Sequence, residues 1–213
     1  DHDLMIDGTQ RFTVERALDL APVLAEVNAF WFEEPFGPDD LDSYVTLRER
    51  LKPYGVRLAT GENEFGLHGF RELLRADAID IVQADASRAG GITEVMEVGR
   101  MAAAHGALLA PHTWCDAVGV VANAHVVAAS PNGLTCEVDQ TGNRFIEELV
   151  GPLPIADGML DLGDRPGLGI TLNEDLVREL RVDPFQMPDG NYCDVIFGRG
   201  QTRYIGDYVP KAA

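Results

Sequence analysis

The segment Phe30-Trp31-Phe32-Glu33-Glu34-Pro35 contains the pattern that organises the chain: a short apolar run followed by a carboxylate. The pattern occurs five more times, each time with an acidic residue or a histidine after the run. The six runs are residues 4–6, 30–32, 56–59, 79–82, 107–110 and 134–136. Most of them lack polar alternation, as is typical of parallel strands buried on both faces. The sequence therefore predicts six parallel strands.

The stretches between these runs have the apolar spacing of helices. In residues 14–27 the apolar side chains recur at positions i, i+3, i+4 and i+7, and similar patterns occur in residues 41–51, 70–74, 92–99 and 118–126. Gly55 and Gly106 stand where two of these helices should end. Alternating strands and helices joined by short loops predict an α/β fold with a parallel sheet and right-handed crossovers.

The polar residues that end the runs recur every 23 to 29 residues, which suits one strand and one helix per repeat; they are Asp7, Glu33, Glu62, Asp85, His112 and Glu137. In a (β/α) barrel such residues converge on one cavity at the carboxyl ends of the strands. A barrel of this type has eight strands, so we expect that the first two are missing upstream. The alternative is a complete open sheet of six strands. We assign residues 1–150 to six βα units and residues 151–213, rich in Gly and Pro, to an irregular C-terminal segment.

Composition narrows the class of protein. The 213 residues include 17 Lys and Arg against 35 Asp and Glu, a net charge of −18, and 46% of the residues are hydrophobic. A large core is expected, and the negative charge disfavours nucleic acid and anionic membranes as partners. Cys115, Cys136 and Cys193 are odd in number, and no signal peptide or membrane-spanning run is evident. These features favour a reducing cytoplasm.

Three carboxylates end three consecutive runs: Asp7, Glu33 and Glu62. Carboxylates that converge in this way repel one another unless a cation lies between them, and hard oxygen ligands suit Mg²⁺. Any single one of them could instead cap the following helix. Because all three occupy the same place after successive runs, we predict a magnesium site. The nearby acids Glu34, Glu64 and Asp3 are competing ligands, although strand alternation would turn Glu34 to the opposite face from Glu33.

Asp85 and His112 end the next two runs. A carboxylate beside an imidazole fixes its tautomer and raises its basicity, which is typical of a general acid or base. Glu137 ends the sixth run and, in protonated form, could donate a hydrogen bond to a developing oxyanion; a salt bridge to Arg144 is the alternative. The other histidines of the central region are interpreted as structural: His68, His105 and His125.

Several segments together resemble the enolase superfamily, specifically its mandelate racemase-like subgroup. They are Leu4-Met5-Ile6-Asp7, Trp31-Phe32-Glu33-Glu34-Pro35, Gly61-Glu62-Asn63, Asp85 with Gly90-Gly91, Pro111-His112 and Pro166-Gly167-Leu168-Gly169. The resemblance implies Mg²⁺ on the three carboxylates, an acid/base pair of Asp85 and His112, and stabilisation of an enediolate by Glu137. It implies abstraction of a proton α to a carboxylate.

The chain departs from this subgroup in two ways. Thr9 stands where an Asn usually follows the first metal ligand. The lysine pair that carries the second base, and the α+β capping domain, would both lie upstream. The resemblance therefore implies the C-terminal barrel portion of a longer enzyme, without the first two strands and the N-terminal capping domain.

The segment from Glu137 to Phe145 looks most like acid-sugar dehydratases and sugar-lactone cycloisomerases. A racemase or epimerase of a hydroxy acid is an alternative, and so is a non-catalytic barrel fragment that acts as a binding or assembly module. A different metal-dependent barrel, such as an aldolase or a metal hydrolase, is a weaker alternative. Such sites are usually richer in His ligands or carry a Schiff-base Lys at a strand end, and neither Lys52 nor Lys211 ends a strand.

The expected partner is a small carboxylate, either an acid sugar or its lactone. Asn63, Arg88 and Trp114 are the residues predicted to contact it, and the Cys115 thiol lines the pocket or simply packs. We also expect a homo-oligomer, because the flanks of the first and last strands of such a fragment invite association.

Overall fold

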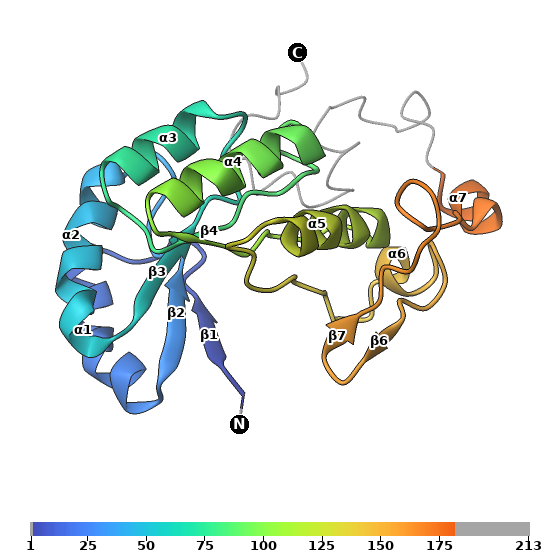
Figure 1. The fold of residues 1–213 in the computed structure, drawn as a ribbon. Coiled ribbons are helices and arrows are strands. Elements are labelled where there is room, and N and C mark those ends of the chain that lie inside the picture. The colour runs from blue at the N-terminus through green and yellow to red at the C-terminus, as the bar shows by residue number, and fades with distance from the viewer. Residues whose placement is uncertain (1, 182–213) are drawn as a thin grey trace, which may run out of the picture. The chain divides into compact units, whose positions relative to one another are not determined.

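The computed structural model describes residues 2–181 of the chain. These residues belong to two compact units, Asp1–Leu172 and a second unit that begins at Asn173 (Figure 1). The part of the predicted irregular segment that follows residue 181 lies outside the described residues. None of the described helices combines the length and apolarity that crossing a membrane requires.

The first unit is built on a parallel sheet of five strands: β1 (Leu4–Asp7), β2 (Ala29–Glu33), β3 (Arg57–Thr60), β4 (Ile81–Val82) and β5 (Leu108–Leu109). Their order in the sheet is β1-β2-β3-β4-β5, the order of the chain. The predicted α/β fold with a parallel sheet is thus confirmed. Successive strands of a (β/α) barrel follow the chain order in this way, whereas a doubly wound sheet reverses its order part-way.

The sixth predicted strand, residues 134–136, is wrong as a regular strand. Gly133 forms one parallel bridge with Leu109, and Leu134 N–H donates to the Leu109 carbonyl at 2.8 Å. Further along the segment, the Glu137 carbonyl accepts a hydrogen bond of 3.0 Å from the side-chain hydroxyl of Thr113 instead of from a backbone N–H of a neighbouring strand. The segment therefore follows β5 without extending the sheet regularly.

All five predicted helices are present, as α1 (Val14–Glu26), α2 (Leu41–Leu51), α3 (His68–Arg75), α4 (Ile92–Ala104) and α5 (Ala117–Ala129). Side chains cap three of their amino ends: Thr13, Asp40 and Asp116 accept hydrogen bonds from first-turn N–H groups. A short 3₁₀ helix, η1 (Lys52–Tyr54), ends at Gly55 with φ +72°. The predicted stop at Gly55 is confirmed, since this left-handed conformation favours glycine.

The two faces of the sheet pack differently. Helices α1 to α4 form a curved outer layer around the strands in Figure 1, and the main core lies between that layer and the strand residues Phe32, Leu58 and Val82. The alternate strand residues Trp31, Ala59 and Ile81 form a smaller buried cluster with Ala110. The strands β2 to β5 are therefore mostly buried on both faces, which explains their near-continuous apolar runs, whereas most residues of β1 are exposed.

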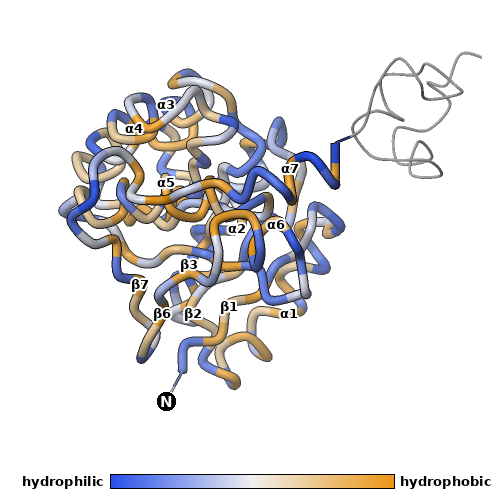
Figure 2. The backbone as a smooth tube through the Cα atoms, turned by 90° about the vertical axis from the view of Figure 1, so that its right-hand side faces the viewer, coloured by the Kyte–Doolittle hydropathy of each residue, from blue (hydrophilic) through white to orange (hydrophobic). Residues whose placement is uncertain are grey.

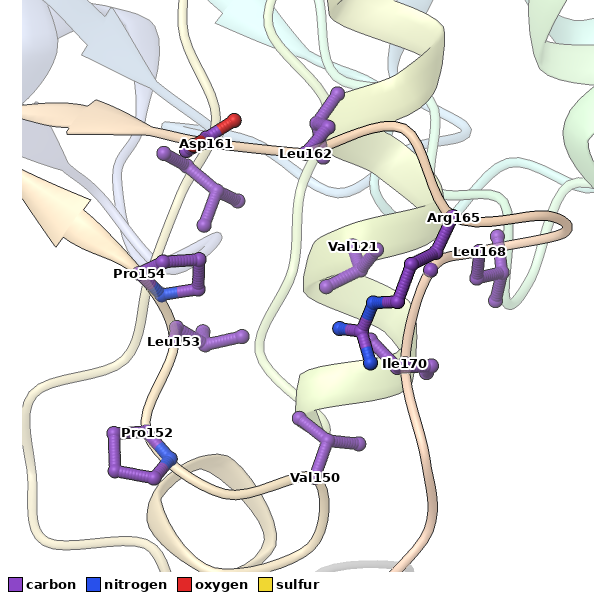
Figure 3. A pocket seen from close by; sticks show the side chains of 12 residues that line it. Val121, Val150, Pro152, Leu153, Pro154, Asp161, Leu162, Arg165, Leu168 and Ile170 are labelled. Atoms are coloured by element: carbon purple, nitrogen blue, oxygen red, sulfur yellow. The ribbon is translucent and has the colours of Figure 1, made fainter.

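The C-terminal part of the first unit differs from the predicted irregular segment. It contains an antiparallel hairpin of β6 (Ile155–Ala156) and β7 (Met159–Leu160), and the short helix α6 (Arg144–Glu147) comes shortly before it. Strands of two residues are too short to leave a periodic pattern in the sequence. The same segment closes over Val121 of α5 and leaves a cavity of about 60 Å³, shown in Figure 3.

The second unit contains one described helix, α7 (Glu174–Leu180). Its first turn is capped by the Asn173 side chain, which accepts from Leu176 N–H at 3.2 Å. This helix was also missed by the sequence-based expectation. In the hydropathy colouring of Figure 2, α7 is mostly hydrophilic, in contrast to α5.

Candidate active site

The predicted site residues lie at the carboxyl ends of the strands. Asp7 and Glu33 are the last residues of β1 and β2 and stand opposite each other in the register of the two strands. Glu62 follows β3 by two residues, and Asp85 and His112 follow β4 and β5 by three. Because the strands are parallel, all five residues belong to one edge of the sheet.

Asp85 and His112 form a buried pair. His112 Nδ1 lies 2.9 Å from Asp85 Oδ2, and the two residues are 4% and 1% exposed. The second carboxylate oxygen, Oδ1, accepts hydrogen bonds from Ser87 N–H and the Ser87 hydroxyl, both at 2.8 Å. The pair fixes the imidazole with Nε2 turned away from Asp85, which is the arrangement of a general acid or base.

The surroundings stabilise the ionised form of both partners. Burial opposes ionisation of Asp85, but hydrogen bonds from His112, Ser87 and Asn123 outweigh it and lower the pKa of Asp85 to about 2. Burial also opposes a charge on His112, yet the hydrogen bond to Asp85 and the nearby carboxylate of Glu62 raise its pKa above the ordinary value. The imidazole thus stays protonated to higher pH than in water.

Asn123 supports this pair from α5. Its side chain is fully buried, and Nδ2 donates to Asp85 Oδ1 at 3.0 Å and to the His112 carbonyl at 3.2 Å. Asn123 Oδ1 accepts from Ala86 N–H at 2.9 Å. One amide therefore joins the loops after β4 and β5. The signal in the sequence was an asparagine inside the most apolar helix, which the sequence analysis did not interpret.

The candidate metal ligands repel one another electrostatically. Burial raises the pKa of Glu33 to about 7, a hydrogen bond from Gln83 opposes the shift, and the charges of Asp7 and Glu137 add to it. Burial likewise raises the pKa of Glu62, and among the further causes the charge of Asp7 acts in the same direction. A divalent cation would relieve this repulsion, so the charges and the oxygen donors fit Mg²⁺.

The side chains are not gathered into a metal site. Among residues 2–181, no group of three or more His, Cys, Asp or Glu side chains is arranged to hold an ion. Glu62 instead lies 3.6 Å from both Arg88 Nη1 and His112 Nε2, and Asp7 Oδ1 accepts from Thr9 N–H at 2.7 Å. The chain thus places three suitable donors on neighbouring strands, and the carboxylates would converge only on binding.

Glu137 lies beside the buried pair. Its Oε2 accepts a hydrogen bond of 2.6 Å from Thr113 N–H, in the residue that follows His112. Its charge contributes to the raised pKa values of both Glu33 and His112. The alternative partner, Arg144, holds Glu148 at 2.6 Å. Glu137 therefore borders both the acid/base pair and the candidate metal ligands.

The three predicted substrate residues differ in their surroundings. Arg88 Nη1 lies 3.2 Å from the Glu62 carbonyl and 3.4 Å from Asn63 Oδ1. Asn63 Nδ2 donates to Glu34 Oε2 at 3.0 Å, so much of its amide is already engaged. Trp114 is 54% exposed beside the buried pair. Arg88 and Trp114 remain the accessible candidates for contact with a substrate.

Comparison with known proteins agrees with this arrangement. A family model described as "Enolase C-terminal domain-like" matches residues 1–176. The chain belongs to the enolase C-terminal domain-like family. The predicted resemblance to the mandelate racemase-like subgroup is thereby confirmed, and the solved structures similar to this member of the family are mandelate racemase/muconate lactonizing enzyme-like proteins.

Two curated relatives illustrate the likeness of this enolase-family chain. It is 34% identical to D-galactarolactone cycloisomerase of Agrobacterium fabrum, over 89% of the chain and 50% of the relative. It is 33% identical to arabinonate dehydratase of Saccharolobus solfataricus, over 85% of the chain and 48% of the relative. The chain thus spans about half the length of these relatives.

Solved structures extend the likeness to three dimensions. The 3,6-anhydro-D-galactonate cycloisomerase of Zobellia galactanivorans matches with a TM-score of 0.78 and 33% identity, over 84% of this chain and 50% of the other. A mandelate racemase/muconate lactonizing enzyme of Jannaschia sp. CCS1 matches with a TM-score of 0.73 and 35% identity, over 81% and 43% of the two chains. The fold of the enolase-family domain is therefore shared with enzymes.

Several supporting residues of this enolase-family site were not predicted from the sequence. Besides Asn123, these are the buried Gln83, hydrogen-bonded to Glu33, and Ser87 and Thr113, which hold Asp85 and Glu137. The Oε1 atom of Gln83 has no hydrogen-bond partner among the described residues. Short polar residues next to strand ends carry no periodic signal, so only the three-dimensional contacts reveal them.

The raised pKa of Glu33 predicts how metal binding depends on pH. The carboxyl must lose its proton to bind a cation, and its pKa is about 7 without one. Affinity for Mg²⁺ should therefore fall about tenfold for each pH unit below pH 7 and level off above it. Isothermal titration calorimetry across this range measures the effect. A constant affinity from acid to alkaline pH would contradict it, and Glu33→Gln serves as the variant without the titrating ligand.

Proposed function

We propose that this chain contributes to the Mg²⁺-dependent abstraction of a proton α to a carboxylate, through an enediolate intermediate. The reaction we favour is acid-sugar dehydration or sugar-lactone cycloisomerisation. The observation that carries the proposal is the buried Asp85–His112 pair at the carboxyl edge of a parallel sheet, with Glu62 next to His112 Nε2. The curated relatives named as a cycloisomerase and a dehydratase support the reaction class.

His112 would move the proton at Nε2. Its Nδ1 is occupied by Asp85 at 2.9 Å, which leaves Nε2 to face the substrate. The raised pKa of His112 favours the protonated ring. In a dehydratase this ring would protonate the departing 3-hydroxyl after the α-proton has been removed. In a cycloisomerase it would assist ring opening or closure.

The carboxylates would divide the remaining tasks. The ligands of Mg²⁺ would be Asp7, Glu33 and Glu62. Asp7 ends β1, Glu33 ends β2 and Glu62 follows β3, all at the same edge of the sheet. When bound, Mg²⁺ supplies positive charge that stabilises negative charge developing on the substrate carboxylate. Glu137 would donate a hydrogen bond to the same developing charge in its protonated form. Arg88 and Trp114 would contact the polyhydroxy carboxylate at the accessible side of the site.

The remaining parts of the proposal concern the whole protein. We propose that the five-stranded sheet, together with residues 134–136 beside β5, is one wall of an eight-stranded (β/α) barrel. The barrel would also require two further strands, one of them carrying a second base, and a capping domain. The chain covers about half of its curated relatives, which leaves room for such parts. A homo-oligomer is proposed because the exposed flanks of the first and last strands of the chain would favour association.

Proton NMR in D₂O tests the function. The intact-length enzyme with Mg²⁺ is incubated with a panel of aldonic and aldaric acids and their lactones. Loss of an α-proton signal is the expected result, and new 2-keto-3-deoxy signals would identify dehydration. Exchange without net product would favour the alternative, a racemase or epimerase. A folded protein that binds Mg²⁺ but exchanges no α-proton would contradict the acid-sugar proposal and favour a binding or assembly module.

A further inference from the structure

Glu34 is a buried carboxylate next to a candidate metal ligand, and the acid/base chemistry makes no use of it. Only 3% of the surface of Glu34 is exposed. Three neutral groups donate to its carboxylate: Gln10 Nε2 at 2.8 Å, Asn63 Nδ2 at 3.0 Å and the Thr60 hydroxyl at 3.2 Å. A carboxylate is costly to bury, and a set of donors this complete is needed to hold it there.

Each donor comes from a segment that carries one of the other candidate ligands. Gln10 lies three residues after Asp7, Thr60 ends β3, and Asn63 directly follows Glu62. The backbone of Glu34 makes the same connections, because its carbonyl accepts from Gln10 N–H at 2.7 Å and its N–H donates to the Ala59 carbonyl at 3.0 Å. One residue thus joins the loops after β1 and β3 to the end of β2.

The backbone at Glu34 is in a rare conformation. Its φ is +33°, in the left-handed region that residues with a side chain seldom adopt. Such strain persists only where the surrounding contacts impose it, and it is concentrated at functional sites. Here it ends the alternation of β2 immediately after Glu33. The carboxylate of Glu34 can therefore lie among the loops instead of following the strand pattern.

We propose that Glu34 is a positioning residue, which fixes the loops carrying Asp7 and Glu62 so that these carboxylates can converge with Glu33 on one cation. It does not bind the metal itself, because its two oxygens are already occupied by three donors. This inference rests on the proposed magnesium site.

The test is Mg²⁺ binding by the full chain, measured by isothermal titration calorimetry at pH 8. Glu34→Gln keeps one acceptor oxygen but turns an amide N–H₂ towards the donors of Gln10 or Asn63. We expect its affinity for Mg²⁺ to fall by about 10–100-fold, the usual effect of losing a residue that orients ligands. Gln10→Ala removes one exposed donor without disturbing the core, and a smaller loss in the same direction is expected.

Asp80→Asn is the matched control. Asp80 is also a carboxylate that joins strands, since it accepts from Leu58 N–H at 2.9 Å and lies 2.8 Å from Arg48 Nη2, but it precedes β4 at the opposite edge of the sheet. This variant should lose thermal stability and keep its affinity for Mg²⁺. A merely structural Glu34 would behave in the same way as Asp80.

The outcomes separate the two proposals. If the unaltered chain binds Mg²⁺ and both Glu34→Gln and Gln10→Ala bind it equally well, the positioning role is wrong. If Glu34→Gln does not fold, Gln10→Ala decides the question alone. If the unaltered chain binds no Mg²⁺ at any pH, the magnesium proposal fails and this inference fails with it.

Discussion

Replacing His112 with asparagine is expected to lower the rate of α-proton exchange or dehydration by about 10²–10⁴-fold, the usual contribution of a general acid or base. Asparagine can still hydrogen-bond to Asp85 and fits the space of a residue that is 4% exposed. It cannot gain or lose a proton near neutral pH. The fold and the affinity for Mg²⁺ should therefore be kept while turnover falls.

His105→Asn is the matched control for this variant. His105 follows the last residue of α4, is exposed, and bonds through Nδ1 to the Met101 carbonyl at 2.8 Å. It precedes β5, whereas His112 follows that strand, so the two residues belong to opposite edges of the sheet. Its replacement should leave turnover unchanged. Circular dichroism and calorimetry verify that both variants fold and bind metal. Equal turnover of His112→Asn and the unaltered protein would overturn the acid/base assignment.

Removing divalent metal is expected to abolish turnover, with a loss larger than that caused by any single side chain that stabilises charge. Burial and the charge of Asp7 raise the pKa values of Glu33 and Glu62, and without a cation the three carboxylates would also repel a carboxylate substrate. Dialysis against a chelator, followed by the exchange assay, measures the loss. Adding Mg²⁺ back should restore the rate.

The control for metal removal is to verify that the protein is still folded without the metal. The core between the helices and the sheet contains no candidate ligand, so circular dichroism and thermal unfolding should show a folded protein after chelation. Full activity in protein shown by elemental analysis to be metal-free would contradict the magnesium proposal. Inactivity accompanied by unfolding would indicate a structural metal instead.

Most of the strands and helices were predictable because β2 to β5 are buried on both faces. Burial on two sides forces apolar runs at Phe32, Leu58 and Ile81, and the helices between them show one apolar stripe each. The prediction of a sixth strand was wrong because an apolar run does not show which partner its backbone will bond to. Here the Glu137 carbonyl bonds to the side chain of Thr113 and not to a neighbouring strand. The two-residue strands β6 and β7 are below the length that any periodicity can reveal.

The site was predictable only in part. Asp85 and His112 could be paired from their places after successive runs, and the structure brings them within 2.9 Å. Asn123 could not be assigned to them, because it comes from a helix and its contacts depend on the angle at which α5 packs. Glu34 was expected to alternate away from Glu33, but that argument assumes extended backbone, and its φ is +33°.

Because Asp7 and Glu33 lie opposite each other in β1 and β2, insertions and deletions within these strands should be poorly tolerated. Side chains alternate between the faces of a strand, so one inserted or deleted codon within β2 would exchange Glu33 with Phe32 or Glu34. A substitution at Phe30, by contrast, leaves the register intact. Homologues should therefore tolerate replacements in these strands far more readily than changes in their length, and insertions should accumulate in the loops beyond them.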